Sequence, residues 1–238
     1  MKPENLIAIT NFMYSFGPAF ELTISELELR RGEIVFLHGR SGCGKTTLMN
    51  LLSGVIPSSL EEMARRTFRL IGYVMHTNTL LPWLNVRQNL AVEGQLRRSE
   101  SAFRKFEEIC ERIGLEENVL KLKPAQLSLG MRQRVEIAKA LSFEPDLLLL
   151  DEALSGIDAS TKEILCDIIW EHVQSHSICV VATAHQVTDL LRLAQRIYVM
   201  DKGSLCAAIT VQDPISERLH LPAKDLFQLA AETLTQEM

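Results

Sequence analysis

A glycine-rich loop at residues 39–46 is the feature that most constrains the fold of this chain. Its pattern is a glycine, four residues and then Gly-Lys-Thr. It follows the apolar run Glu33–His38 and precedes a helix-like stretch from Lys45 to about Leu52. Glycines let the backbone curl so that successive N–H groups point at phosphate oxygens, and the following helix adds its positive N-terminal end. A glycine-rich turn without a ligand would not need this strand–loop–helix context.

In such a loop the lysine reaches the β- and γ-phosphates of a nucleotide, and the next hydroxyl ligates Mg²⁺. The sequence therefore predicts a site for ATP with Mg²⁺, in which Lys45 also acts in catalysis and Thr46 is a metal ligand. The predicted nucleotide-binding residues are Gly39, Arg40, Ser41, Gly42, Cys43, Gly44, Lys45, Thr46 and Thr47.

Strand and helix patterns alternate along the 238 residues, which predicts an α/β fold with a mostly parallel sheet. The alternating Phe20, Leu22 and Ile24 predict an antiparallel β edge. Residues 84–142 instead carry charged, helix-periodic segments. We expect one domain, 1–238, with a nucleotide-binding core at 1–83 and 143–238 and a helical subdomain inserted at 84–142. Further strands are predicted at Leu70–Met75, Leu147–Leu150, Ile178–Ala182 and Ile197–Met200, and helices at Ser101–Ile113, at Met131–Leu141 and from the capping-box pattern Ser160–Glu163 onward.

Two acids, Asp151 and Glu152, directly follow the apolar run Leu147–Leu150. Ligands of α/β sheets lie beyond the carboxyl ends of the strands, so both acids should face the phosphate loop. We expect Asp151 to hold Mg²⁺ and Glu152 to polarise the water that attacks the γ-phosphate. A strand that ends in two solvated acids is the alternative, and the nearby phosphate loop argues against it. The pair favours ATP hydrolysis over transfer of phosphate to another substrate.

Bulk composition limits the partners of this chain. The net charge is -5 and no basic stripe occurs, which argues against binding nucleic acid. Five cysteines without paired spacing indicate reduced thiols in a cytosolic protein. No apolar run reaches the roughly 18 residues that span a bilayer. We therefore expect a cytoplasmic chain whose membrane work passes through a partner.

The segment at residues 127–134 lies between the phosphate loop and the acid pair and reads Leu-Ser-Leu-Gly-Met-Arg-Gln-Arg. It resembles the signature motif of ABC ATPases. With the phosphate loop, Asp151-Glu152, the run Ser155–Asp158 and Ala184-His185, it makes five ABC motifs in the order of the family. The resemblance covers roughly residues 6–204. It implies an ATP-hydrolysing subunit of an ABC transporter.

In that family two ATPase domains pack head to tail, and each signature motif faces the phosphate loop of the other domain. The resemblance implies that Ser128 and the Gly130 N–H contact the γ-phosphate in trans. It places Asp158 in the loop that links the two sites, and His185 at the γ-phosphate as a catalytic residue. An aromatic residue upstream of the loop should stack on adenine; Tyr14 and Phe16 both fit, and we favour Tyr14.

Two positions depart from the family pattern. His76 stands where relatives carry a glutamine that contacts Mg²⁺ and the attacking water, so we expect His76 in both the catalytic and the metal set. Its protonated form would repel the metal. Leu129 replaces the first glycine of the signature motif. Both departures leave open a degenerate or regulatory subunit that binds ATP but hydrolyses it weakly.

The segment Asn78–Asn89 resembles the corresponding segment in importers of nitrate, sulfonates and taurine. The resemblance implies transmembrane permease subunits as partners, a second ATPase subunit in a homodimer or heterodimer, and a substrate-binding protein. It also implies a peripheral position on the inner face of the cell membrane. Pro82 and Trp83 would give the docking surface a rigid, partly apolar face. The alternative is a packed loop between the subdomains, and for Trp83 both interpretations stay open.

Overall fold

The computed structural model describes residues 5–17, 20–60, 67–77, 79–97, 101–183, 191–211, 215–219, 221 and 225. Its strands are β1 (Asn5–Ser15), β2 (Glu21–Arg30), β3 (Ile34–His38), β4 (Ile71–Val74), β5 (Leu147–Asp151), β6 (Cys179–Thr183), β7 (Arg196–Asp201) and β8 (Ser204–Thr210). Its helices are α1 (Lys45–Ser53), α3 (Val86–Arg97), α4 (Ala102–Arg112), α5 (Leu129–Ser142), α6 (Ala159–His176) and α8 (Ile215–Arg218), with short 3-10 turns at Glu117–Lys121 and Pro124–Gln126.

All eight strands form one sheet in the order β1-β2-β8-β7-β3-β6-β5-β4. β3 pairs in parallel with β6 and β7, and β5 with β4 and β6. β1 and β2 pair antiparallel at one edge, and β7 turns back antiparallel into β8. The mostly parallel sheet with an antiparallel edge is therefore confirmed. No strand was predicted at β1, whereas the Lys202-Gly203 hairpin turn signal after the predicted strand Ile197–Met200 agrees with the turn between β7 and β8.

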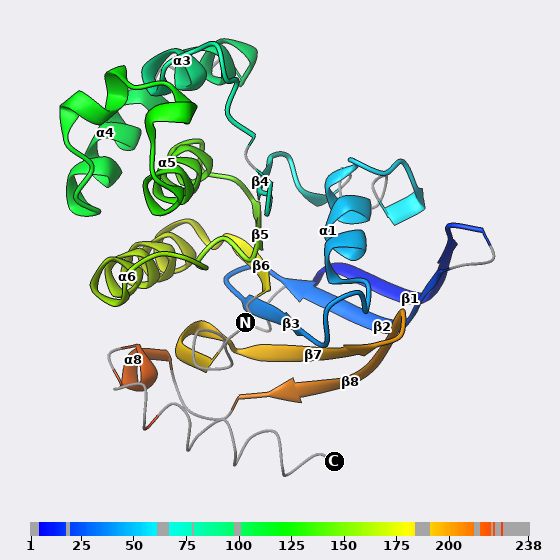
Figure 1. Ribbon diagram of the computed structural model, residues 1–238. Coiled ribbons are helices and arrows are strands. Elements are labelled where there is room, and N and C mark those ends of the chain that lie inside the picture. The colour runs from blue at the N-terminus through cyan, green and yellow to red at the C-terminus, as the bar shows by residue number, and fades with distance from the viewer. Residues whose placement is uncertain are drawn as a thin grey trace.

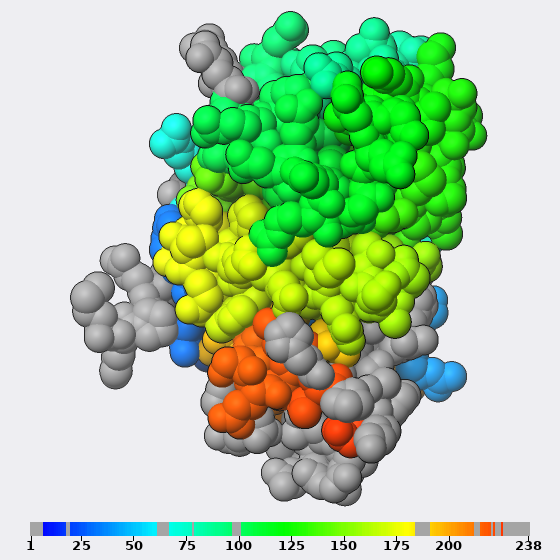
Figure 2. Space-filling model, turned by 90° about the vertical axis from the view of Figure 1, so that its left-hand side faces the viewer, coloured from blue at the N-terminus to red at the C-terminus, as the bar shows by residue number. Residues whose placement is uncertain are grey.

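The central strands are buried on both faces of the sheet, and their side chains divide between two cores. Phe36, Leu148 and Val180 belong to the core that α5 and α6 cover. Their neighbours Leu37, Leu149 and Val181 belong to the core that α1 covers. Figure 1 shows α1 and α6 on opposite sides of the sheet, with α3, α4 and α5 gathered beyond β4 and β5. On the face shown in Figure 2, the green helical region lies above α6, in yellow, and α8, in orange, lies below it.

α6 begins earlier than its capping-box pattern predicts. The N-cap is Asp158, whose carboxylate accepts a hydrogen bond from the Thr161 N–H at 2.9 Å. The expected cap, Ser160, lies inside the helix and donates its hydroxyl to Asp158 Oδ1 at 2.7 Å. The ionised aspartate two residues earlier is an equally good cap by residue type, and its negative charge is also favourable at the helix N-terminus. Among the described residues, none of the helices combines the length and apolar character needed to cross a membrane.

Candidate functional site

The phosphate loop connects the end of β3 to the start of α1. Gly39, Gly42 and Gly44 have φ angles of 154°, 80° and 110°, a region that favours glycine. A Cβ on Gly39 would lie 2.2 Å from the Met200 backbone oxygen, so no side chain fits there. α1 then starts at Lys45 with Gly44 as its N-cap. Its first N–H groups have no helical partner and are available to an anion.

Lys45 lies across the backbone of this loop. Its Nζ donates to the Gly39 carbonyl at 2.7 Å and to the Arg40 carbonyl at 3.2 Å, and it lies 3.8 Å from Cys43 Sγ. Burial, together with the nearby Lys45 ammonium, lowers the pKa of His38 at the end of β3. The loop therefore concentrates positive charge beside a run of N–H donors, which is the electrostatic environment that phosphates require.

Asp151 is the buried acid at the end of β5, with 1% of its surface exposed. Its Oδ2 accepts a hydrogen bond from the Thr46 hydroxyl at 2.7 Å, and its Oδ1 accepts one from the Thr183 hydroxyl at 2.8 Å. The predicted metal ligands Thr46 and Asp151 thus lie together, although they are 105 residues apart in sequence. Their two oxygens fit Mg²⁺, which binds few protein oxygens and completes its shell with phosphate and water.

Glu152 follows in a left-handed backbone conformation, with φ of 55°. Its N–H donates to the Thr183 hydroxyl at 2.9 Å, so one threonine of β6 contacts both acids. Glu152 Oε2 lies 3.3 Å from His76 Nδ1, just beyond β4. The structure brings Lys45, Thr46, Asp151, Glu152 and His76 to one end of the sheet. Thr183 was missed because a threonine at the end of an apolar strand carries no signal of its own.

The signature motif forms the start of α5. Ser128 is the N-cap, and its hydroxyl accepts a hydrogen bond from the Met131 N–H at 3.1 Å. A Cβ on Gly130 would lie 3.1 Å from the Gly156 carbonyl oxygen, so α5 closely approaches the loop after the acid pair. The start of α5 therefore combines free backbone N–H groups with Gly130, which has no side chain to block an approaching anion.

A hydrogen-bonded chain links this helix to the catalytic candidate. Gln133 Nε2 donates to Ser155 Oγ at 3.3 Å, and Ser155 Oγ donates to the Glu152 carbonyl at 2.7 Å. Asp158, in the same loop, caps α6, and the hydrogen bonds from Thr161 and Ser160 lower its pKa to about 2. The signature helix and the acid pair are thus connected within one chain.

Both aromatic candidates for adenine stacking lie near the end of β1. Tyr14 is half-buried against the core that α1 covers, whereas Phe16 is 46% exposed. Their ring centroids are 4.9 Å apart, and Phe16 lies 6.2 Å from Phe20. Phe20 packs closely against the phosphate loop: a Cβ added to Gly44 would lie only 3.0 Å from the Phe20 ring. Both Tyr14 and Phe16 remain predictions. His185 lies outside the described residues, so its placement also remains a prediction.

In the described part of the chain, no three His, Cys, Asp or Glu side chains gather in a group that could hold a metal ion. His76 as a metal ligand stays a prediction, since its Nδ1 faces Glu152.

The family model for "ABC transporter" matches residues 22–155 of this chain. A relative from Pseudomonas syringae pv. syringae, "Aliphatic sulfonates import ATP-binding protein SsuB 1", is 34% identical over 236 residues, covering 98% of this chain and 97% of its own. The chain belongs to the ABC transporter ATP-binding family. "Nitrate transport protein NasD" of Klebsiella oxytoca is 33% identical over 230 residues and covers 92% of this chain and 86% of its own.

Solved structures share the fold of this ABC ATPase. "Structure of ATP binding subunit of ABC transporter" has a TM-score of 0.75 at 20% identity, covering 94% of this chain and 98% of the other. The ADP- and Pi-bound dimer of the ATP-binding cassette MJ0796 has a TM-score of 0.72 at 24% identity, covering 87% and 99%. Family membership makes this chain an ATP-binding, transport-coupled ATPase.

Proposed function

We propose that this chain powers the import of small anions of the nitrate or sulfonate kind through separate transmembrane permease subunits. The observation that carries the motor function is the set of hydrogen bonds that joins Thr46 of the phosphate loop to Asp151, and Asp151 through Thr183 to Glu152. The choice of cargo rests on the relatives, whose names specify aliphatic sulfonates and nitrate. The peripheral, inner-face location follows from the same analogy.

The residues at 39–47 would hold the triphosphate, and Mg²⁺ would neutralise part of its charge when bound. Thr46 and Asp151 would supply oxygen ligands, directly or through water. Lys45 would exchange its contacts with the Gly39 and Arg40 carbonyls for phosphate oxygens, which are stronger acceptors for an ammonium group.

Glu152 would take the general-base position for the attacking water. Its left-handed backbone and its hydrogen bond to Thr183 fix the backbone position from which the Glu152 side chain extends. His76 would orient Glu152 through the 3.3 Å contact between Nδ1 and Oε2. His185 would reach the γ-phosphate from the segment after β6. An enclosed site that orients both groups favours hydrolysis.

Two ATPase domains would enclose each nucleotide. Ser128 and the Gly130 N–H at the start of α5 would contact the γ-phosphate bound to the other domain, with Asp158 near the boundary between the two sites. Leu129 is 63% exposed at this helix start, which supports a surface that a second domain covers. We propose that the chain is one ATPase domain, in which the helical subdomain at 84–142 is inserted into the nucleotide-binding core at 1–83 and 143–238.

The permease subunits would dock beside residues 79–85. Trp83 is 65% exposed there, and a large exposed aromatic side chain suits a protein interface. A substrate-binding protein would deliver the anion to the permease. Co-purification of the tagged chain with membrane subunits tests this part of the proposal; recovery of the chain alone from detergent-solubilised membranes would contradict it.

Paired variants test the motor. Lys45→Ala should abolish binding of MgATP, because it removes the principal positively charged side chain that contacts the phosphates. Glu152→Gln keeps the size of the side chain and should bind MgATP normally while losing hydrolysis by about 100-fold or more. Equilibrium binding with a fluorescent ATP analogue and phosphate release measure the two effects. Unchanged ATP affinity in Lys45→Ala would show that the nucleotide site lies elsewhere.

The adenine contact is tested separately from the phosphate contacts. Tyr14→Ala and Phe16→Ala remove one ring each, and stacking of a base on an aromatic ring contributes about 1 to 3 kcal/mol. The variant that loses ATP affinity by about tenfold or more identifies the stacking residue. Equal, small losses in both would exclude stacking by this pair.

A weakly hydrolysing, regulatory subunit is the second candidate, favoured by His76. An imidazole offers one acceptor nitrogen where the glutamine of relatives offers a carbonyl oxygen and an amide group, so hydrolysis should be slower than in His76→Gln. Phosphate release measured at one pH compares the two proteins. Equal rates would remove the argument for a histidine-limited enzyme.

A further inference from the structure

Glu136 is a buried carboxylate on the face of α5, with 4% of its surface exposed. Its Oε1 accepts a hydrogen bond from the Thr79 N–H at 2.7 Å, and the Thr79 hydroxyl and the Leu80 N–H also hydrogen-bond to the carboxylate. Burial raises the pKa of Glu136, while these donors and the Lys139 ammonium oppose that shift. A buried carboxylate is costly unless donors of this kind surround it. Because separating α5 from the segment at Thr79 and Leu80 would remove those donors, the contact favours one arrangement of the two.

The segment that Glu136 contacts leads directly to the catalytic candidates. Thr79 follows His76 by three positions, and His76 Nδ1 lies 3.3 Å from Glu152 Oε2. On its other side the segment runs into a loop fixed by Asn89. The Asn89 amide accepts a hydrogen bond from the Leu81 N–H at 2.7 Å and donates to three carbonyls, those of Leu81, Leu84 and Asn85.

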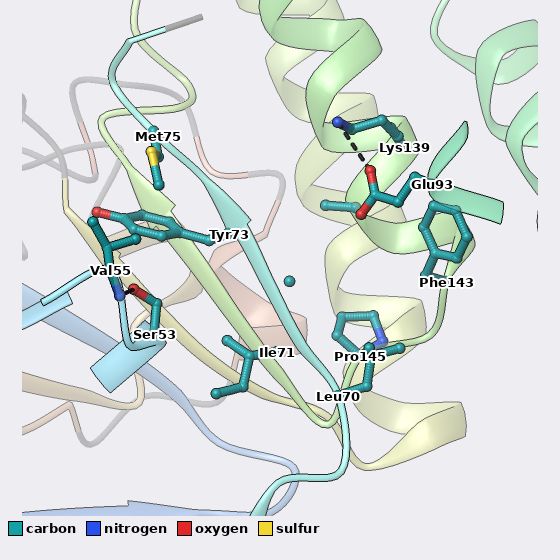
Figure 3. A pocket seen from close by; sticks show the side chains of 12 residues that line it. Ser53, Val55, Leu70, Ile71, Tyr73, Met75, Glu93, Lys139, Phe143 and Pro145 are labelled. Atoms are coloured by element: carbon teal, nitrogen blue, oxygen red, sulfur yellow. Dashed lines mark hydrogen bonds and ion pairs between the residues drawn. The ribbon is translucent and has the colours of Figure 1, made fainter. Parts of the chain in front are cut away.

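A cavity of 190 Å³ lies between β4, α3 and α5. Figure 3 shows Met75, the residue before His76, at one end of the cavity, and Lys139 and Glu93 at the other. Lys139 and Glu93 form an ion pair of 3.0 Å. The side chains at this level leave space between β4 and α5, whereas the Glu136 carboxylate contacts the segment after β4 directly.

α5 is also the helix that begins at Ser128 with the signature motif. One rigid element thus carries both the predicted γ-phosphate contact and the carboxylate that holds the segment after His76. We propose that Glu136 is a positioning residue for ATP hydrolysis. Through Thr79 and Leu80 it fixes His76, and thereby the Glu152 carboxylate, relative to the signature helix. The inference rests on the proposed function, because it concerns the same hydrolytic site.

Glu136→Met tests this inference, because methionine keeps the length of the side chain and removes both acceptors. The kcat for ATP should fall about 10- to 100-fold while the affinity for MgATP changes by less than about threefold. Glu136→Gln retains one acceptor oxygen for the Thr79 N–H and should recover most of the rate. Glu93→Gln removes the ion pair at the same cavity without touching Thr79, and its kcat should stay within about twofold.

A double-mutant cycle separates positioning from general destabilisation. If Glu136 acts through His76, then Glu136→Met should slow a His76→Ala protein far less than it slows the unaltered protein. Equal slowing in both backgrounds, or an unchanged kcat in Glu136→Met, overturns the inference. If Glu136→Met does not fold, Glu136→Asp keeps the charge and withdraws the carboxylate from Thr79, and the same pattern is expected.

Amide hydrogen exchange provides an arm that needs no hydrolysis. The Thr79 and Leu80 amides should exchange at least about tenfold faster in Glu136→Met than in the unaltered protein, with the Thr77 amide following them. Unchanged exchange at these amides also overturns the inference. Failure of the proposed function would appear differently, as absent ATP hydrolysis in the unaltered protein or hydrolysis that persists in Glu152→Gln.

Discussion

Thr183 occupies the end of β6, where its hydroxyl donates to Asp151 Oδ1 at 2.8 Å and accepts from the Glu152 N–H at 2.9 Å. Thr183→Val keeps the branched shape and removes the hydroxyl. The change leaves a carboxylate oxygen and an amide without their partners in a place where Thr183 is 3% exposed. A hydrogen bond to a charged group contributes about 1.5 to 3 kcal/mol and one between neutral groups about 0.5 to 1.5. The expected loss of unfolding free energy is therefore about 2 to 4.5 kcal/mol.

The same change should slow hydrolysis. Glu152 holds a left-handed backbone with φ of 55°, and its N–H would lose the contact that fixes it. If Glu152 is the general base, as we propose, a displacement of its carboxylate by about 1 Å should lower kcat by about 100-fold. Thr183→Ser retains the hydroxyl and serves as the control in urea unfolding and in phosphate release. A Thr183→Val protein within about 1 kcal/mol and twofold of Thr183→Ser would refute the reasoning.

Three further predictions concern the rest of the fold. Gly203→Ala places a Cβ 2.0 Å from the Glu21 carbonyl oxygen, at a φ of 84°. It should lower the free energy of unfolding by well above the roughly 1 to 2 kcal/mol that a left-handed backbone alone costs a non-glycine residue. Gly32→Ala, at φ of 70° with no atom within 4 Å, should cost only that strain, and equal urea midpoints for the two would contradict this. Ser128→Ala removes the N-cap of α5 and should lower the unfolding free energy by about 1 kcal/mol, whereas Ser128→Asn keeps a capping side chain and should retain the stability. Equal thermal unfolding of the two variants would count against the cap. Burial lowers the pKa of His172 from 6.5, so below that pH the unfolded chain binds a proton more readily and the protein loses stability as pH falls. His172→Gln should show a smaller loss in urea unfolding, and an equally steep pH dependence would exclude His172 as its source.

Local patterns determined much of this site. The phosphate loop needs only its glycines, lysine and threonine in order between a strand and a helix, since its chemistry comes from backbone N–H groups close in sequence. The position of Asp151 and Glu152 after an apolar run likewise placed both at the end of a buried strand. Because these features depend on neighbouring residues, the sequence alone was sufficient to predict them and the family they belong to.

Contacts between distant segments depended on the tertiary structure. Thr183 and Glu136 contact residues 32 and 57 positions away, so neither has a neighbour in sequence that reveals its partner. β1 alternates buried Ile7 and Ile9 with exposed Ala8 and Thr10, but that it pairs antiparallel with β2 appears only in the folded sheet. α6 starts at Asp158 rather than Ser160 because a cap depends on backbone geometry as well as residue type. Residue order alone predicted which groups should meet the phosphates. Long-range packing decided which residues hold those groups in place.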